Sequence, residues 1–196
     1  EDDEDRAMRA AINMFKRLAD LNRVRVQRGD MPIKMGVGLN TDMVVSGNIG
    51  SPKRMDYTMI GDGVNLAARL ESACKTYSAK ILISDNTYRS LKGTYRIRDI
   101  DRVIVKGKTE PVAIYEVLDY HTEETFPHLM EVVNQFNNGI QHYRKREWSE
   151  AIDAFKEALA RNPDDTLSQI YIDRCKVLKK QNLGDDWNGV WVMKTK

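Results

Sequence analysis

The chain has 196 residues, a length that allows one well-buried core and a smaller second unit. Lys and Arg total 31 against 29 Asp and Glu, so the charge gives no reason to expect nucleic acid or an anionic membrane as a partner. The two cysteines lie far apart and form no disulfide or metal pattern, and no apolar run approaches the roughly 20 residues of a membrane span.

The acidic start of the chain, EDDEDRAMRAA, predicts a helix that runs to about Gly29. We interpret its carboxylates as a solvated helix start, where they suit the helix dipole, and not as a metal site. The start has neither the form of a signal peptide nor an initiator methionine, so we expect a piece of a longer, cytoplasmic protein. Apolar residues then recur at helical spacing, at Ala7, Ala10, Met14, Leu18 and Leu21.

A glycine-containing segment follows. Residues 33–39, IKMGVGL, predict a strand, residues 40–42 a turn, and residues 43–49, MVVSGNI, its hairpin partner. GVGLNT resembles a dinucleotide-binding fingerprint, but Thr41 stands where the third glycine belongs and no helix follows. We therefore interpret the glycines as residues that let the backbone form a tight hairpin.

The next segment combines a strand over 55–60, a tight turn over 61–63 and a helix to about Thr76. Asn65 and Arg69 are four residues apart, so they share one face of this helix. A guanidinium beside an amide near a helix start suits an anionic, phosphate-like ligand. The opposite face carries the apolar residues Leu66, Ala67, Leu70, Ala73 and Cys74.

Short apolar and alternating runs continue to residue 118. Residues 80–84 predict a buried strand, and Ser84 or Asp85 caps a brief helix. The β-like runs are YRIRDID, RVIVKG and PVAIYEVL. Helices and strands that alternate with hairpins predict an α+β sandwich.

The pattern changes after a predicted linker over 121–131. The spacing over 132–165 matches a tetratricopeptide repeat, in which small residues let two antiparallel helices pack closely. A third helix, to about Gln181, could cap it. One repeat cannot bury its own faces, so we expect it to dock on the preceding domain, a second chain or further repeats. The matching residues are Gly139, Tyr143, Trp148, Ala151, Phe155, Ala158 and Pro163.

Three segments, 36–51, 55–71 and 105–117, resemble the signature of class III nucleotide cyclases, which convert ATP or GTP to the cyclic monophosphate. In that family a segment of the form YTxIGxxVNxAARLE leads into the catalytic helix. The resemblance implies a ferredoxin-like fold, of which this chain holds the C-terminal portion. The expected domains are the cyclase catalytic domain over 1–120, the linker over 121–131, the repeat with its capping helix over 132–181, and a tail over 182–196.

The resemblance implies a role for four residues of this chain. Asn65 would orient the ribose, and Arg69 would stabilise the transition state at the phosphates. Thr58 falls at a base-selectivity position. The phosphate-binding lysine falls at Lys106, with its neighbour Lys108 as the alternative.

Thr58 favours ATP, because a small hydroxyl can hydrogen-bond the adenine amino group. Family members with Lys and Thr at the two selectivity positions use ATP, and the partner lysine would lie upstream of this chain. Asp56 is an alternative selectivity residue, but the register from Asn65 leads to Thr58. We interpret Asp56 as a surface or turn carboxylate near Arg54.

The resemblance also implies two metal ions, Mg²⁺ or Mn²⁺, held by two aspartates that have no counterpart in this chain. Family active sites form in a head-to-tail homodimer, where one protomer gives the aspartates and the other gives the Asn and Arg. We therefore expect this chain to be inactive alone. The histidines show no ligand spacing: His121, His128 and His142.

The expected function is part of a bacterial adenylate cyclase, which forms 3′,5′-cyclic AMP and pyrophosphate from ATP in intracellular signalling. Two alternatives stay open. One is a guanylate cyclase, and the other is a catalytically silent module whose helical repeat binds a protein partner. A nucleic-acid-binding domain is disfavoured, because the charge is nearly balanced.

Overall fold

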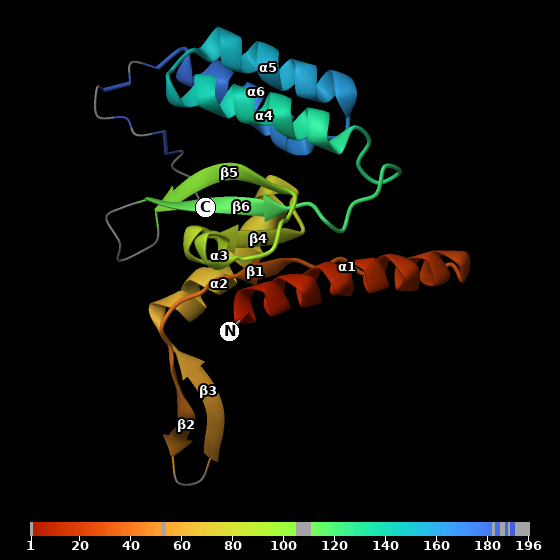
Figure 1. Ribbon diagram of the computed structural model, residues 1–196, viewed down its shortest axis with the longest axis vertical. Coiled ribbons are helices and arrows are strands. Elements are labelled where there is room, and N and C mark those ends of the chain that lie inside the picture. The colour runs from red at the N-terminus through yellow and green to blue at the C-terminus, as the bar shows by residue number, and fades with distance from the viewer. Residues whose placement is uncertain are drawn as a thin grey trace. The chain divides into compact units, whose positions relative to one another are not determined.

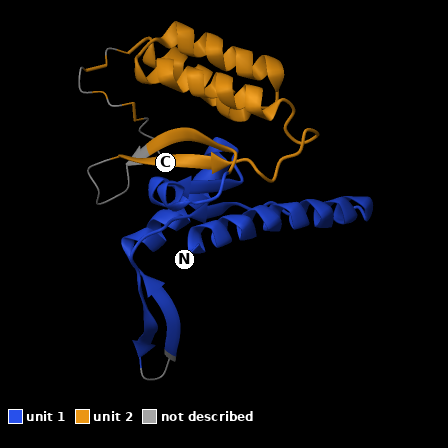
Figure 2. Ribbon diagram, in the orientation of Figure 1, with its two compact units in different colours: residues 1–94 blue, residues 95–196 orange. Residues whose placement is uncertain are grey.

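Figure 1 shows the chain as a computed structural model that describes residues 2–51, 54–104, 111–181, 183–184, 187 and 189–190. The chain divides into two compact units, residues 1–94 and 95–196, which Figure 2 colours separately. Each unit combines helices with strands, as the predicted α+β class requires. Within the described residues, none of the helices has both the length and the hydropathy that a membrane span needs.

Helix α1, Asp3–Gln27, opens the first unit, which confirms the predicted helix. The predicted apolar series is not its buried face, because Met14 and Leu21 are 49% and 48% exposed. The acidic start is not wholly solvated. The carboxylate of Asp5 is buried and accepts hydrogen bonds from the backbone N–H groups of Lys92 and Gly93, each at 2.9 Å. The prediction of a solvated start is therefore wrong for Asp5, which fastens α1 to the end of its unit. Only the first half of α1 supplies buried residues: Asp5, Met8, Ala11, Ile12 and Phe15.

Strand β1, Val37–Leu39, pairs in parallel with β4, Ile81–Ser84, so that Val37 lies opposite Ile81 and Leu39 opposite Ile83. The predicted hairpin between 33–39 and 43–49 is wrong. The segment after the turn forms β2, Val45–Ser51, which pairs antiparallel with β3, Arg54–Ile60. The sequence pattern favoured pairing with the adjacent segment 43–49, whereas β1 pairs with β4, a strand about forty residues later in the chain.

The β2–β3 hairpin extends away from β1, β4 and α2, Asp62–Tyr77, the helix that follows β3 (Figure 1). Its large apolar side chains are exposed, with Val45 at 71%, Tyr57 at 73% and Met59 at 58%. Met43, just before the hairpin, is 91% exposed. This is a large apolar surface for one hairpin.

Helix α2, Asp62–Tyr77, packs its apolar face on β1 and β4. The face is the one predicted, since Leu66, Leu70 and Cys74 are buried together with all three isoleucine and leucine residues at 81–83. The short helix α3, Asp85–Ser90, follows β4 directly. Ser84 caps it by accepting a hydrogen bond from the N–H of Thr87, as predicted.

The second unit begins with an antiparallel hairpin of β5, Ile97–Ile104, and β6, Pro111–Val117. The register runs from Ile97 opposite Val117 to Ile104 opposite Pro111, with a shift between Asp99 and Asp101. Such a bulge leaves Ile100 out of the ladder.

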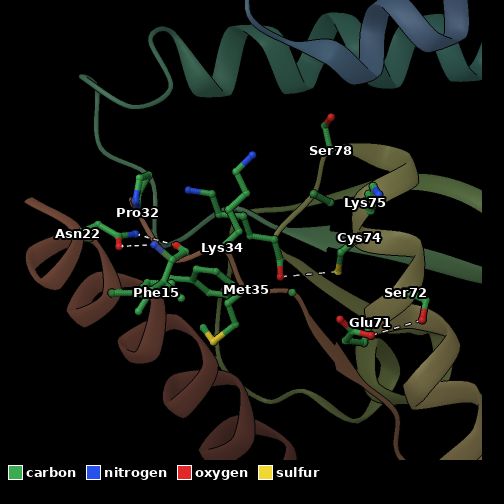
Figure 3. A pocket seen from close by; sticks show the side chains of 16 residues that line it. Phe15, Asn22, Pro32, Lys34, Met35, Glu71, Ser72, Cys74, Lys75 and Ser78 are labelled. Carbon is green, nitrogen blue, oxygen red and sulfur yellow. Dashed lines mark hydrogen bonds between the residues drawn. The ribbon is translucent and has the colours of Figure 1, made fainter. Parts of the chain in front are cut away.

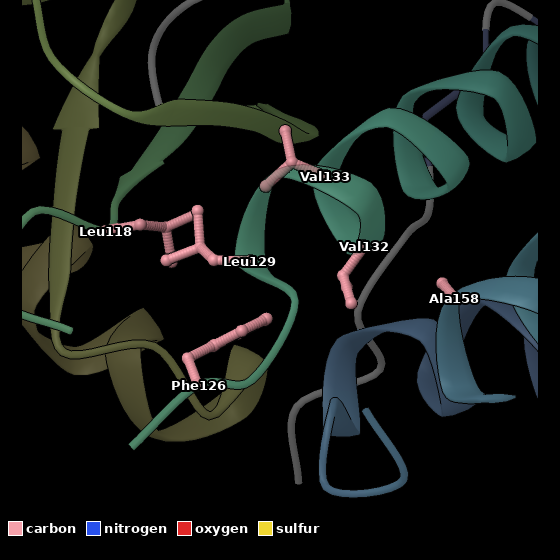
Figure 4. Packing of buried hydrophobic residues seen from close by; sticks show 6 residues of the cluster. All are labelled: Leu118, Phe126, Leu129, Val132, Val133 and Ala158. Atoms are coloured by element: carbon pink, nitrogen blue, oxygen red, sulfur yellow. The ribbon is translucent and has the colours of Figure 1, made fainter. Parts of the chain in front are cut away.

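Three helices follow: α4, Leu129–Arg144, α5, Trp148–Arg161, and α6, Thr166–Leu178. The predicted small residue Gly139 lets α4 and α5 cross closely, because a Cβ there would lie 2.5 Å from the Phe155 ring. Helix α4 begins inside the predicted linker. Figure 4 shows the buried cluster that joins β6 and this linker to the helices: Leu118, Phe126, Leu129, Val132, Val133 and Ala158.

Successive residues of β5 make polar contacts with α4, with α6 and with the residue that precedes α6. Arg98 donates to Asp165 at 2.8 Å, and also to Glu116 of β6 at 2.7 Å. Asp99 pairs with Arg144, the C=O of Ile100 accepts from Tyr171 Oη, and Asp101 pairs with Arg174. The helices of this unit therefore dock on the β5–β6 hairpin, one of the three sites that the sequence left open.

The described part of the tail packs on the helices. The ring of Trp187 lies against the rings of Tyr143 and Trp148, whereas Trp191 lies outside the described residues. Cys74 and Cys175 are both free and buried. Burial raises the pKa of the Cys175 thiol to about 12.

Candidate functional site

Helix α2 presents the two residues that the sequence singled out. Asn65 and Arg69 are both exposed on this helix, and the intervening Leu66 and the following Leu70 are buried on its other side. Neither Asn65 nor Arg69 has a hydrogen-bond or ion-pair partner within the described part of the chain. In particular, Arg69 pairs with neither Asp62 nor Glu71 of the same helix, so its exposed guanidinium can meet an anion from solvent.

Close packing on β1 fixes where α2 lies. A Cβ at Gly38 would stand 2.3 Å from the C=O of Ala67 and 2.5 Å from the N of Glu71, both backbone atoms of α2. At Gly36 it would stand 3.1 Å from Cys74 Cβ. The glycines are therefore sites of close helix approach, and their interpretation as relief for a hairpin turn is wrong.

Gly38→Ala should lower the free energy of unfolding by about 1–3 kcal/mol, the usual cost of forcing an extra methyl group into a packed contact. Circular dichroism during thermal unfolding measures it. Gly47→Ala is the matched control, because nothing lies within 4 Å of a Cβ at that position in β2. Equal unfolding midpoints for the two variants would contradict the role of Gly38 as a contact point.

The structure places the other predicted residues on different elements. Thr58 is exposed on β3, opposite Gly47, and is separated from Asn65 by the Gly61 turn. Asp56 is also exposed on β3. Lys106 and Lys108 lie outside the described residues, so their roles stay predictions.

A cavity of about 1070 Å³ lies beside the far end of α2, between that helix, α1 and residues 32–36 (Figure 3). Its lining includes Phe15, Met35 and Cys74 together with Lys34 and Lys75. Asn65 and Arg69 are not among the lining residues. The cavity is therefore separate from the exposed face that carries the candidate site.

The sequence analysis missed a set of polar contacts at the start of α2. Asn40, interpreted from the sequence only as a turn residue, donates from Nδ2 to the C=O of Gly63 at 3.0 Å. Its Oδ1 accepts from Ser84 Oγ at 2.6 Å. No local pattern marks this set, because its members lie at three distant places in the sequence.

No group of three or more His, Cys, Asp or Glu side chains suited to hold a metal ion occurs among the residues that the structure describes. The buried carboxylates of the second unit, Asp101, Glu116 and Asp165, are engaged by arginines. The donor set of the described residues therefore does not fit a divalent metal site.

The family is shown by comparison with known proteins. The family model described as "Adenylate and Guanylate cyclase catalytic domain" matches residues 2–120. The chain therefore belongs to the adenylate and guanylate cyclase catalytic domain family.

Individual relatives carry the same kind of description. The chain is 38% identical over 173 residues, 86% of its length, to "Adenylate cyclase, terminal-differentiation specific" of Dictyostelium discoideum. It is 41% identical over 120 residues, 58% of its length, to "Adenylate cyclase" of Anabaena cylindrica. These matches span only 8% and 24% of the two relatives. The match to the Dictyostelium protein covers 173 residues, whereas the family model ends at residue 120. The similarity to that protein therefore extends into the segment that holds α4–α6.

Solved structures agree with the fold. The crystal structure of the guanylyl cyclase Cya2 is 36% identical, with a TM-score of 0.53, over 60% of this chain and 58% of that one. A bacterial light-regulated adenylyl cyclase, at 20% identity and a TM-score of 0.50, covers 67% of this chain and 38% of that one, and shows the fold alone.

Proposed function

We propose that this chain is the part of an adenylate cyclase that stabilises the transition state of cyclic AMP formation from ATP. One observation carries the proposal: in a chain of this family, Asn65 and Arg69 stand together on the exposed face of a helix whose other face is fixed on the sheet. The names of the two curated relatives support ATP as the substrate.

The reaction joins the ribose O3′ to the α-phosphorus while the bond from that phosphorus to the pyrophosphate oxygen breaks, and the 3′-hydroxyl proton is released. Asn65 orients the ribose so that O3′ attacks in line. Arg69 donates to the α-phosphate oxygens, where negative charge builds up in the transition state. Lys106 binds the phosphates, and Thr58 contacts the adenine amino group.

Mg²⁺ or Mn²⁺ belongs to the proposal as a cofactor of the whole protein. Among the described residues no group is suited to hold such an ion, and we keep the metal-binding aspartates upstream of this chain, where the family resemblance puts them. The residues of this chain bind and orient the nucleotide and neutralise its phosphates.

A head-to-tail homodimer would bring the two halves of the site together. The exposed apolar β2–β3 hairpin supports it, because a surface with Met43, Val45, Tyr57 and Met59 so exposed is typical of an interface. A second copy would cover it. This chain alone is then inactive, since it supplies only one half of each site.

The segment after residue 120 has a finer proposed identity. We propose that α4 and α5 form one tetratricopeptide-like repeat that α6 caps, supported by the Gly139–Phe155 crossing and the buried Ala151 and Ala158. The predicted tail at 182–196 is kept in this proposal, whereas the linker predicted at 121–131 ends before Leu129, where α4 begins. A cytoplasmic location fits a substrate such as ATP, and a bacterial origin stays a prediction.

A catalytically silent module that binds a protein partner is the competing function. One face of its helices is already used within the second unit, where α4 and α6 contact β5. A decayed site would also have little reason to keep all three of Asn65, Arg69 and Thr58. We therefore favour the enzyme.

The test is product formation by the full-length parent protein with Mg²⁺ or Mn²⁺ and either ATP or GTP. We expect cyclic AMP from ATP, at a rate at least ten times that of cyclic GMP from GTP. Separation of the products by chromatography measures both. A preference for GTP would assign a guanylate cyclase, and no product from either nucleotide would favour the silent module.

A further inference from the structure

The first turn of α2 receives a hydrogen bond from the segment that follows β1. Asn40 Nδ2 donates to the C=O of Gly63, two residues before Asn65. The next residue on the same side, Asp42, touches Gly63 so closely that a Cβ there would lie 2.4 Å from Asp42 Cβ. Together with the glycines at 36 and 38, this segment contacts α2 along most of its length, from Gly63 to Cys74.

The chemistry of its partners fixes the orientation of the Asn40 amide. The C=O of Gly63 can only accept, so it must face the NH₂ group. The amide oxygen then faces Ser84, whose hydroxyl donates to it at 2.6 Å. Asn is the residue that can donate to Gly63 and accept from Ser84 from one short side chain, whereas Asp would only accept.

Two buried hydroxyls hold Asn40 in place. Ser84 and Thr87 are 0% and 2% exposed. Thr87 Oγ1 accepts from the N–H of Thr41 at 2.9 Å and lies 3.4 Å from the C=O of Leu39, the residues on either side of Asn40. Residues at the start of α3 therefore hydrogen-bond Asn40 and its neighbour Thr41. Asn40 in turn donates a hydrogen bond to α2.

We propose that Asn40 is a positioning residue for the reaction, because it sets where the first turn of α2 lies and hence where Asn65 and Arg69 meet the nucleotide. This inference rests on the proposed function. Its consequence is catalytic, since a displacement of about 1 Å in a group that acts in the transition state can cost about 10²-fold in rate.

Asn40→Asp in the full-length parent protein tests it. The variant keeps the size of the side chain and the acceptor for Ser84 but turns a carboxylate oxygen toward the C=O of Gly63. We expect kcat to fall by about 10- to 100-fold while KM for ATP changes less than about threefold.

Asn86→Ala is the control. Asn86 also donates an amide hydrogen bond to a backbone C=O, that of Thr41 at 3.2 Å, but that acceptor is not in α2. We expect its kcat to stay within about twofold of the unsubstituted protein. An unchanged kcat in Asn40→Asp, or an equal loss in both variants, would overturn the inference.

The double variant Asn40→Asp with Arg69→Ala separates positioning from general damage. If Asn40 acts through the helix that carries Asn65 and Arg69, the loss that Asn40→Asp causes should be smaller in the Arg69→Ala background than in the unsubstituted protein. Losses that simply multiply would overturn the inference.

Hydrogen exchange of the backbone amides over residues 64–69 needs no catalysis, and it tests Asn40 even if the proposed function fails. We expect faster exchange in Asn40→Asp than in Asn86→Ala. Equal exchange would overturn the inference. If Arg69→Ala were fully active while exchange was faster in Asn40→Asp, Arg69 and Asn40 would have no role in catalysis. Asn40 would then only hold the first turn of α2 in place.

Discussion

Arg69→Ala in the full-length parent protein should lower kcat for cyclic AMP formation by about 10³-fold, with a much smaller change in KM for ATP. The guanidinium is exposed on α2 and has no partner within the described residues, so it is available to the phosphates. Removing one donor aimed at developing negative charge costs about 10²–10³ in rate, and here a full positive charge is lost as well. Single-turnover measurements at saturating ATP isolate the chemical step.

Arg23→Ala is the matched control for that experiment. Arg23 lies on α1, and its 70% exposed side chain pairs with the exposed Asp20. The substitution removes the same charge from a different helix, so kcat should stay within about twofold. Equal turnover in wild type and Arg69→Ala would remove Arg69 from the mechanism, and an equal loss in both variants would point to net charge and not to the site.

The sequence predicted the helices well, and the buried face of α2 correctly, because both depend on local spacing. For α1 the predicted apolar series was wrong, since Met14 and Leu21 are exposed whereas Met8 and Phe15 are buried. The pattern of Leu66, Leu70 and Cys74 placed Asn65 and Arg69 on the exposed side of α2, as the structure has them. Strand partners depend on distant residues, and there local reading failed. The pairing of β1 with β4 and the contact of Asn40 with Gly63 have no signature in any one segment.

The polar residues of β5 show a second limit. Charged side chains are almost never fully buried unless they are paired, yet Arg98 and Asp101 of β5 are each 3% exposed. Their burial follows from the docking of α4–α6, which no property of the strand reveals. The bulge at Ile100 is a further feature that the sequence does not reveal. It leaves the C=O of Ile100 free to accept a hydrogen bond from Tyr171, between the buried ion pairs of Arg98 and Asp101.

These contacts make Arg98 the residue whose loss should harm the second unit most. Its guanidinium bonds Glu116 and Asp165, and all three side chains are nearly fully buried. Burial alone lowers the pKa of Arg98, but the two carboxylates outweigh it and raise the pKa, so the group stays charged. Arg98→Met would leave two buried carboxylates without their counter-ion, which typically costs about 3–5 kcal/mol.

Urea unfolding followed by tryptophan fluorescence measures this cost, because all three tryptophans, at 148, 187 and 191, belong to the second unit. Arg161→Met is the control: its pair with Glu131 is long, at 3.6 Å, and about half exposed on both sides, so the loss should be under about 1 kcal/mol. Similar midpoints for the two variants would mean that the buried network does not hold the unit together.

A compensated variant distinguishes the loss of an attraction from the creation of unpaired charges. Arg98→Met combined with Glu116→Leu and Asp165→Asn removes the charges together, and the new amide oxygen at position 165 would still accept from the hydroxyl of Ser168. Because apolar replacement of a whole buried ion group is often neutral or stabilising, we expect most of the lost stability to return. If it does, the network serves to fix how the helices meet β5 more than to stabilise them. A variant as unstable as Arg98→Met alone would show instead that the ion pairs themselves supply the stability of the second unit.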